Sequence, residues 1–504
     1  MTFDANRSDL ILGIIGTGTM GRGIAQIAVV AGATVILVDG RAGAAAEARD
    51  GIAFTLGALV DKGRLTPAAA AAATARLVVG DTVAELGPCH AVVEAIVEDI
   101  AVKQALMRDL EAVVSDGCVI ASNTSSLSVT AIAAACRLPG RVAGFHFFNP
   151  VPLMKVVEVI DGLLTEPAVA EALMDLARRM GHHPVRAKDT PGFIVNHAGR
   201  GYGTEALKLA GEGVAEFAEL DRLLKGAAGF RMGPFELLDL TALDVSHPVM
   251  ESIYEQYYQE PRYRPSPITR NRLAAGLLGR KSGRGFYVYD GNKARVPPPP
   301  LPPPAWTGPV WVEPGAEAVS GLVAGLGATL DRGEAPGSTS LCLVAPLGED
   351  CTEAAMRLGL DARRTVAIDP LFGLDGHRCL MTNPLTEPQY RDGALGLFAS
   401  DGAAVSVTKD SVGTAAQRVV VTIVNIGCDI AQQGIATPED IDRAVVLGLG
   451  YPLGPLAWGD RLGPEVVLRL LHTMLETTGD PRYRPSPWLR RRARLGVSLL
   501  TQEI

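Results

Sequence analysis

Hydrophobic and polar positions alternate between two patterns along the first part of the chain. Short apolar runs predict buried strands, and Ala-rich stretches of helical spacing, such as Met20–Ala31 and Lys103–Val114, separate them. The apolar runs are Leu10–Ile15, Thr34–Val38, Ala91–Ile96, Cys118–Ser122 and Arg141–Phe148. Strands that alternate with helices predict a mainly parallel sheet covered on both faces. We therefore expect an α/β fold, with a doubly wound, Rossmann-type domain over residues 1–188.

The pattern changes near Pro191, where helical spacing becomes dominant and continues to about Leu278. This predicts an all-α domain over residues 189–292. A proline-rich stretch, Val296–Ala305, follows it. Proline removes backbone donors and favours an extended spacer, so residues 293–307 are predicted to be a linker.

Behind the linker the chain repeats itself. The heptapeptide Pro261–Pro267, PRYRPSP, recurs intact as Pro481–Pro487, and Asp221-Arg222 recurs as Asp442-Arg443 at nearly the same offset. A single register over this length indicates a duplicated helical domain, which we place at residues 405–504. Residues 308–404 have a strand-helix-strand pattern and predict a reduced Rossmann-like unit.

Composition excludes several classes of protein. The net charge is -8 and the 504 residues contain no long Lys/Arg run, which argues against nucleic-acid binding. No uninterrupted apolar run is long enough to span a membrane. The seven cysteines are dispersed and form no CxxC pair, so we expect reduced thiols and no metal site. The N-terminus lacks a secretory pattern, which favours the cytoplasm.

The first apolar run leads into Gly16-Thr-Gly-Thr-Met-Gly21, and a helical pattern follows. In this context Gly16 permits a tight turn, Gly18 lets a pyrophosphate approach the backbone, and Gly21 lets helix and strand pack closely. Asp39 ends the second strand, where a carboxylate can bind ribose hydroxyls and repel a 2′-phosphate. A glycine-rich turn without a ligand is the alternative, but the strand and helix around it favour NAD. Arg41 weakens the preference over NADP slightly.

Two titratable residues lie in neighbouring apolar strands. His146 lies in Gly144–Phe148, and Glu158 lies in Val156–Ile160 after a short turn. A carboxylate among such neighbours is costly unless it is paired, and the turn allows the two side chains to meet. Alcohol oxidation needs a base near neutral pH, and a carboxylate can orient the imidazole. Taken singly, a histidine in a strand is more typical of the core, and a glutamate in a strand is more typical of a sheet edge. Because both follow a dinucleotide-binding pattern in the sequence, the pair favours a catalytic role.

Several motifs resemble those of the L-3-hydroxyacyl-CoA dehydrogenase family, in family order. They are Ser122–Leu127, His146–Pro152, Lys188–Asn196 and Gly279–Tyr287. The longer layout resembles a bacterial subgroup of 3-hydroxybutyryl-CoA and 3-hydroxyadipyl-CoA dehydrogenases linked to phenylacetate breakdown. The resemblance covers essentially the whole chain and implies NAD-dependent oxidation of an acyl-CoA substrate, as in β-oxidation.

The resemblance also implies roles for individual residues. His146 matches the general base, Glu158 its orienting partner, Ser125 a hydrogen-bond donor to the reacting oxygen, and Asn196 a substrate contact. Further cofactor contacts are implied for Met20, Glu98, Lys103, Asn123 and Lys281. Simpler readings stay open, since Glu98 and Lys103 could pair at a helix start and Ser125 could cap a helix. A helical arm from Ala42 to about Ala75, with Lys62 and Arg64 near its tip, would contact coenzyme A.

The second half lacks a GxGxxG motif and a His-Glu pair, and Gln417 stands where the repeat aligns Asn196. We therefore predict one active site per chain. The attached copy would form an intrachain pseudo-dimer of helical domains, and whole chains could pair again as a homodimer. A dehydrogenase of free 3-hydroxy acids and a catalytically silent NAD-binding protein are the alternatives.

Overall fold

The computed structural model describes residues 4–503, which form two compact units. Unit 1 contains the chain up to His197 together with Gln433–Leu449, and unit 2 contains Ala198–Gln432 and the chain from Gly450 onward. A short segment from the C-terminal part of the sequence thus belongs to the N-terminal unit. The five-segment division predicted from the sequence treats 405–504 as one domain, whereas Gln433–Leu449 packs elsewhere because its apolar face is buried in unit 1.

Unit 1 is built on an eight-stranded sheet in the order β3-β2-β1-β4-β5-β6-β7-β8. Strands β7 and β8 run opposite to the other six. The strands are β1 Ile11–Ile15, β2 Thr34–Val38, β3 Leu77–Val79, β4 Ala91–Glu94, β5 Val119–Ser122, β6 Val142–Phe147, β7 Val156–Asp161 and β8 His183–Lys188. The predicted apolar runs are confirmed as the central strands, and the doubly wound α/β class is confirmed with them.

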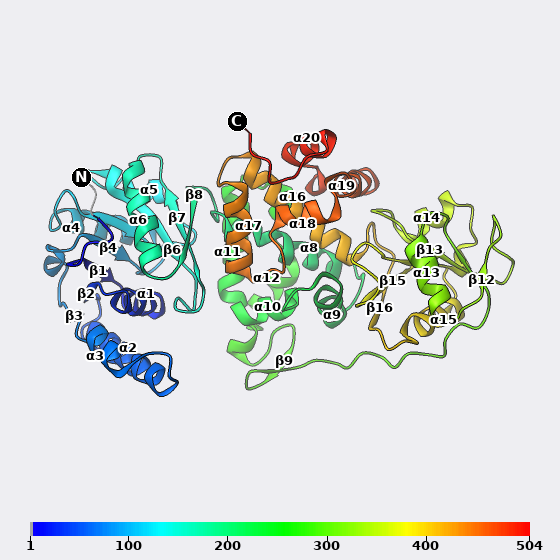
Figure 1. Cartoon of the computed structure of the whole chain (residues 1–504), viewed down its shortest axis with the longest axis horizontal. Coiled ribbons are helices and arrows are strands. Elements are labelled where there is room, and N and C mark those ends of the chain that lie inside the picture. Colours follow the sequence, from blue (N-terminus) through cyan, green and yellow to red (C-terminus); the bar gives the residue numbers. More distant parts are fainter. Residues whose placement is uncertain (1–3, 504) are drawn as a thin grey trace. The chain divides into compact units, whose positions relative to one another are not determined.

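Helices cover both faces of this sheet (Figure 1). One apolar core includes Ile24 and Leu173 from α1 and α6, and the other includes Met107 and Ile132 from α4 and α5. The helices of unit 1 are α1 Thr19–Val30, α2 Ala44–Asp61, α3 Pro67–Thr74, α4 Ile100–Glu111, α5 Val129–Ala133, α6 Pro167–Arg179, α7 Val195–Ala198 (which ends at the boundary) and α17 Pro438–Leu449. Successive strand residues enter opposite cores, which explains why these strands are apolar throughout.

Unit 2 contains the first helical domain and most of its copy, as predicted. The first domain has α8 Arg200–Gly211, α9 Phe217–Ala228, α10 Pro234–Thr241, α11 Leu243–Gln256 and α12 Pro267–Ala274. The copy has α16 Ala415–Gln432, α18 Pro455–Leu462, α19 Pro464–Thr478 and α20 Pro487–Leu495. Helix α17, which the repeat pairs with α9, is the member of the copy that lies in unit 1.

The reduced Rossmann-like unit is also confirmed. Its sheet has the order β12-β11-β13-β14-β15-β16, and its antiparallel pair β14-β15 corresponds to β6-β7. The elements are β11 Val310–Val312, α13 Glu317–Gly325, β12 Leu330–Asp331, β13 Leu341–Val344, α14 Cys351–Arg357, β14 Thr365–Ile368, β15 Arg378–Thr382, α15 Pro388–Ala399 and β16 Val405–Lys409.

The predicted linker is shorter than expected at both ends. Its first residues form β10 Lys293–Arg295, which pairs with β9 Val288–Asp290, and Trp306 packs on Tyr390 of α15. Backbone pairing and aromatic burial therefore anchor the ends, and the prolines between them are extended and mostly exposed. Six short 3-10 helices complete the described chain: η1 Val83–Leu86, η2 Pro139–Arg141, η3 Pro261–Tyr263, η4 Arg280–Ser282, η5 Ala362–Arg364 and η6 Pro481–Tyr483.

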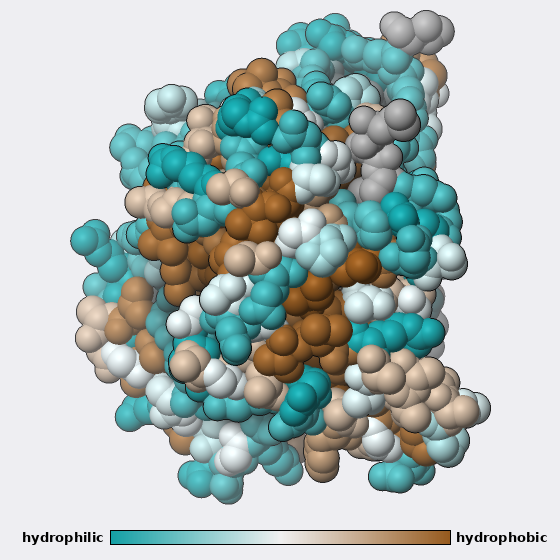
Figure 2. Space-filling view, turned by 90° about the vertical axis from the view of Figure 1, so that its left-hand side faces the viewer, coloured by the Kyte–Doolittle hydropathy of each residue, from teal (hydrophilic) through white to brown (hydrophobic). Residues whose placement is uncertain are grey.

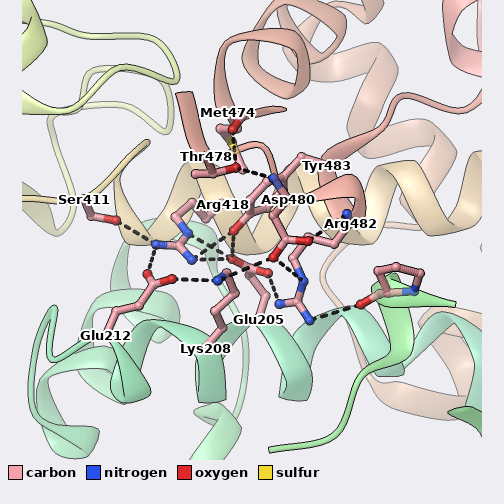
Figure 3. A network of polar contacts seen from close by, with 11 residues as sticks. Glu205, Lys208, Glu212, Ser411, Arg418, Met474, Thr478, Asp480, Arg482 and Tyr483 are labelled. Carbon is pink, nitrogen blue, oxygen red and sulfur yellow. Dashed lines mark hydrogen bonds and ion pairs between the residues drawn. The ribbon is translucent and has the colours of Figure 1, made fainter. Parts of the chain in front are cut away.

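The repeated heptapeptide lies where the two helical copies meet. Arg482, from the second heptapeptide, pairs with Glu205 of α8 at 2.9 Å, and Arg418 of α16 pairs with the same carboxylate at 2.8 Å (Figure 3). The equivalent arginine of the first heptapeptide, Arg262, pairs with Asp429 of α16, a different position along the central helix. Each copy therefore sends the same arginine into the central helix of the other, which explains the intact repeat.

The surface is mixed in polarity. Figure 2 shows one side of the molecule, where apolar residues form patches within a largely polar surface. Phe54 on α2 is 81% exposed and Leu163 is 87% exposed. Within residues 4–503, none of the helices combines the length and the apolar character needed to cross a membrane.

Candidate active site

The glycine turn between β1 and α1 has the geometry that the motif predicts. Gly16 has a φ of +86°, and a Cβ there would lie 2.5 Å from the carbonyl oxygen of Ala95. A Cβ at Gly21 would lie 1.8 Å from the carbonyl oxygen of Gly16, so helix and turn are in close contact. A Cβ at Gly18 would meet nothing within 4 Å. The helix N-terminus, with Met20 in its first turn, is therefore open to an approaching pyrophosphate.

Asp39 lies just after β2 and is held against the glycine turn. Its Oδ2 accepts hydrogen bonds from the backbone N–H of Thr17 at 2.6 Å and from the Thr17 hydroxyl at 2.8 Å. Burial raises the pKa of Asp39, but these bonds and one from the Arg41 backbone outweigh burial and leave the pKa below its ordinary value. Arg41 is itself paired with Glu47 at 2.5 Å. The Asp39 carboxylate is thus a fixed anion, and the neighbouring Arg41 is already paired with Glu47. Both features fit a ribose with a free 2′-hydroxyl.

If Asp39 binds the ribose hydroxyls, Asp39→Asn should lower kcat/KM for NAD by about tenfold or more, because a charged acceptor is lost. The same change should raise kcat/KM for NADP, since a 2′-phosphate is no longer repelled. Steady-state kinetics with both cofactors test this, and Asp116→Asn, at an exposed ion pair with Arg137, is the control. An unchanged NAD/NADP ratio in Asp39→Asn would contradict the assignment.

His146 and Glu158 meet as the sequence predicts. They lie opposite each other in the antiparallel pair β6-β7, and His146 Nδ1 lies 2.7 Å from Glu158 Oε2. His146 is 4% exposed and Glu158 is fully buried. The other carboxylate oxygen, Oε1, accepts hydrogen bonds at 2.9 Å from the backbone N–H groups of Ile194 and Val195.

This arrangement determines which nitrogen of the His146 imidazole can accept a proton. An ionised Glu158 only accepts hydrogen bonds, so the proton of neutral His146 lies on Nδ1, and Nε2 carries the lone pair. The ring also contacts Phe148, with ring centroids 4.4 Å apart. A histidine held in this way can take up one proton at Nε2, and the buried carboxylate stabilises the imidazolium that forms.

The turn after β5 carries Ser125 and is organised by Glu98. One oxygen of Glu98 accepts hydrogen bonds from the Thr124 hydroxyl at 2.7 Å and from the backbone N–H groups of Ser125 and Ser126 at 2.9 and 3.0 Å. The other oxygen lies 3.3 Å from the ammonium of Lys103. Burial raises the pKa of Glu98, but the charge of Lys103 and these bonds bring it below its ordinary value. Glu98 therefore holds the Ser125 turn as an anion.

Lys103 is a buried cation. It is 1% exposed, and its ammonium contacts Glu94 at 2.5 Å as well as Glu98. The sequence reading missed Glu94, which also accepts a hydrogen bond from Ser122 at 2.6 Å. The sequence feature that could have identified Glu94 is a carboxylate at the end of a buried strand. Asn123 is half-buried, and its Oδ1 accepts a hydrogen bond from the Phe147 backbone N–H at 2.9 Å.

The remaining predicted residues lie in different units. Asn196 lies in α7, directly after the residue whose N–H binds Glu158. Lys281 lies in η4 of unit 2, where it pairs with Asp244. Among residues 4–503, the structure contains no group of three or more His, Cys, Asp and Glu side chains that could hold a metal ion.

The second half has a closed polar cluster where the first half has the His146-Glu158 pair. The offset that relates Asn196 to Gln417 relates Glu158 to Cys379, and the backbone N–H of Asp369 donates to the Cys379 carbonyl. Asp369 accepts hydrogen bonds from Thr414 and, at 3.1 Å, from Gln417. Burial raises the pKa of Asp369. This aspartate is hydrogen-bonded within the cluster and has no imidazole partner of the kind that Glu158 has.

Two family models match the chain. The model described as "3-hydroxyacyl-CoA dehydrogenase, NAD binding domain" matches residues 11–190. The model described as "3-hydroxyacyl-CoA dehydrogenase, C-terminal domain" matches twice, at residues 192–289 and 413–498, which confirms the predicted duplication.

Relatives and solved structures agree with these models. The chain is 38% identical, over 96% of its length and 97% of the relative, to the 3-hydroxyadipyl-CoA dehydrogenase of Escherichia coli K12. It is 41% identical, over 55% of its length and 90% of the relative, to the mitochondrial hydroxyacyl-coenzyme A dehydrogenase of Rattus norvegicus. The crystal structure of an Escherichia coli 3-hydroxybutyryl-CoA dehydrogenase superimposes with a TM-score of 0.85 at 35% identity, covering 97% of this chain and 99% of that one.

The chain belongs to the 3-hydroxyacyl-CoA dehydrogenase family. As the motifs predict, it is an NAD-dependent enzyme of that family.

Proposed function

We propose that this enzyme oxidises the 3-hydroxyl group of a short L-3-hydroxyacyl-CoA, such as 3-hydroxybutyryl-CoA or 3-hydroxyadipyl-CoA, with His146 as the general base. The hydrogen bond of 2.7 Å between His146 and a fully buried Glu158 carries this proposal. The similarity to a relative named 3-hydroxyadipyl-CoA dehydrogenase makes that thioester the first to test, in a catabolic setting such as β-oxidation or phenylacetate breakdown.

The proton chemistry follows from the residues of this chain. His146 Nε2 accepts the proton of the substrate hydroxyl, and Glu158 stabilises the resulting imidazolium. Ser125 donates a hydrogen bond to the reacting oxygen, and Asn196 helps to hold the substrate. Bound NAD supplies the hydride acceptor. Gly16, Gly18 and Gly21 bind its pyrophosphate, Asp39 binds its ribose, and Glu98 supports the nicotinamide side through the Ser125 turn.

A steady-state panel with NAD tests the proposal. We expect turnover of 3-hydroxybutyryl-, 3-hydroxyadipyl- and longer 3-hydroxyacyl-CoA, with the highest kcat/KM among the short thioesters. Free 3-hydroxy acids are the matched controls, because they carry the same reacting carbon without coenzyme A. Equal turnover of free acid and thioester would favour the alternative dehydrogenase, and NAD binding without any turnover would favour a silent protein.

The arm formed by α2 and α3 is an observation in favour of coenzyme A as part of the substrate. Lys62 and Arg64 are exposed between these helices. A cavity of about 210 Å³ lies between α1, α2 and the turn after β6, and its lining includes Arg22, Thr55 and Asn149. The Arg22 guanidinium, with Thr55 and Asn149 as neutral donors beside it, can bind a phosphate of coenzyme A.

Arg22→Gln should therefore raise KM for an acyl-CoA about tenfold and leave kcat unchanged, because a charged contact remote from the reacting carbon is lost. The KM for the matching N-acetylcysteamine thioester, which lacks the nucleotide, should not change. Both KM values can be read from initial rates of NADH formation. An equal rise for both thioesters, or a rise in KM for NAD instead, would contradict this assignment.

We further propose that the two helical copies form an intrachain pseudo-dimer. The contacts of Arg482 with Glu205 and of Arg262 with Asp429 support it, since each copy places the same arginine against the central helix of the other, as in a two-fold interface. Sedimentation of the full chain will determine whether intact chains pair again.

A further inference from the structure

The segment Gln433–Leu449 comes from the non-catalytic copy but covers the edge of the catalytic sheet. Strand β8 ends that sheet, and an edge strand presents unpaired backbone groups. The backbone N–H of Lys188 donates to the Ile435 carbonyl at 2.9 Å, and the N–H of Arg186 lies 3.4 Å from the Asp440 carboxylate. Ile435 is 2% exposed. The second copy thus covers part of the edge of the sheet that carries Glu158.

Gly448, near the end of α17, brings this helix into close contact with the start of helix α7 and the start of strand β7. A Cβ at Gly448 would lie 3.0 Å from both methyl carbons of Val195 and 3.3 Å from a methyl carbon of Val156. Few real Cβ contacts are as short, so a methyl group would displace the neighbours by a few tenths of an ångström.

Both neighbours of Gly448 are joined to the catalytic carboxylate. Val195 donates its backbone N–H to Glu158 Oε1 at 2.9 Å, and Asn196 follows it directly. Val156 begins β7, the strand that carries Glu158. A displacement at Gly448 therefore reaches Glu158 through one hydrogen bond and through one strand.

We propose that α17 is a positioning element of the active site, supplied by the copy that has no catalytic residues of its own. Gly448 permits the close contact that fixes Val195, and Val195 fixes Glu158 against His146. The second half is then needed for turnover as well as for stability. This inference rests on the proposed roles of His146 and Glu158.

The chain offers matched controls because the arrangement is reciprocal. Helix α9 of the first copy packs against β15 and β16 of the non-catalytic sheet, and a Cβ at Gly226 of α9 would lie 2.5 Å from His377. Gly226→Ala thus creates a clash in the corresponding helix, one position from the residue that aligns with Gly448 and away from the catalytic residues. Gly321→Ala, in α13, makes the same substitution where a Cβ would meet nothing within 4 Å.

The test is Gly448→Ala in the full chain. We expect kcat to fall about tenfold, because small misplacements of catalytic groups are costly, while KM for NAD stays unchanged. Alanine favours a helix over glycine, so a loss of helix propensity would not explain the fall. Gly226→Ala and Gly321→Ala should keep kcat within about twofold of the parent, since distant sites act independently.

A double-mutant cycle with Val195→Ala separates positioning from general destabilisation. If the methyl group acts through Val195, Gly448→Ala should change kcat little when Val195 is already alanine. An unchanged kcat in Gly448→Ala, or an equal loss in both Val195 backgrounds, would overturn the proposal. Full activity of His146→Ala would instead refute the proposed function on which it rests.

Discussion

His146→Ala should lower kcat by about 10³-fold, because the hydroxyl proton loses its proposed acceptor while the hydride still has to leave. Binding of NADH should change little, since the glycine turn and Asp39 lie on β1, α1 and β2, away from the β6-β7 pair. Turnover of 3-hydroxybutyryl-CoA at saturation and the dissociation constant of NADH from its fluorescence measure the two effects separately.

Glu158→Gln should lower kcat by about 10²-fold or more with the fold intact. Glutamine can still accept the two backbone N–H bonds from Ile194 and Val195, so the local structure is preserved. It cannot supply the negative charge that stabilises the imidazolium or secure the tautomer that leaves Nε2 free.

His183→Gln is the control for both variants, because His183 is an exposed histidine at the start of β8. It should turn over substrate at the parental rate. If His146→Ala retained more than about a tenth of the parental kcat, general-base catalysis by this residue would be excluded, since such catalysis contributes about 10²–10⁴-fold.

The sequence was sufficient for features that depend on local spacing. The strand, glycine turn and helix around Gly16 follow from neighbouring residues, and so does the end of β2 at Asp39. The His146-Glu158 pair was predictable because a short turn joins two strands whose alternation buries the glutamate. The register places the two residues directly opposite each other.

Features that depend on distant residues could not be predicted in this way. The bond between Arg186 and Asp440 joins residues 254 positions apart, and no periodicity indicates that α17 leaves its own copy for the sheet of unit 1. Lys103 illustrates a second limit. Its pairing with Glu98 could be anticipated from the helix start, but its burial and its second partner, Glu94, depend on packing with a distant part of the sheet.

Glu205→Ala should cause the largest loss of stability among the contacts between the helical copies. Glu205 is fully buried, and it pairs with Arg418 and Arg482, whose side chains are 3% and 5% exposed (Figure 3). Burial lowers the pKa of Arg418, but Glu205 and the other acidic neighbours raise it above its ordinary value, so the guanidinium stays charged. Removal of the carboxylate leaves two buried cations without their shared partner, which costs about 3–5 kcal/mol.

Glu212→Ala is the matched control, because Glu212 also pairs with Arg418 but is 40% exposed. Water can replace an exposed carboxylate, so this variant should lose only about 0–1 kcal/mol. Denaturant midpoints followed by tryptophan fluorescence compare the two variants. Equal losses of stability in the two variants would mean that burial of the carboxylate does not determine how much it contributes to stability. A variant that replaces Glu205, Arg418 and Arg482 together with apolar residues should recover much of the stability of Glu205→Ala, because the penalty arises from unpaired buried charge.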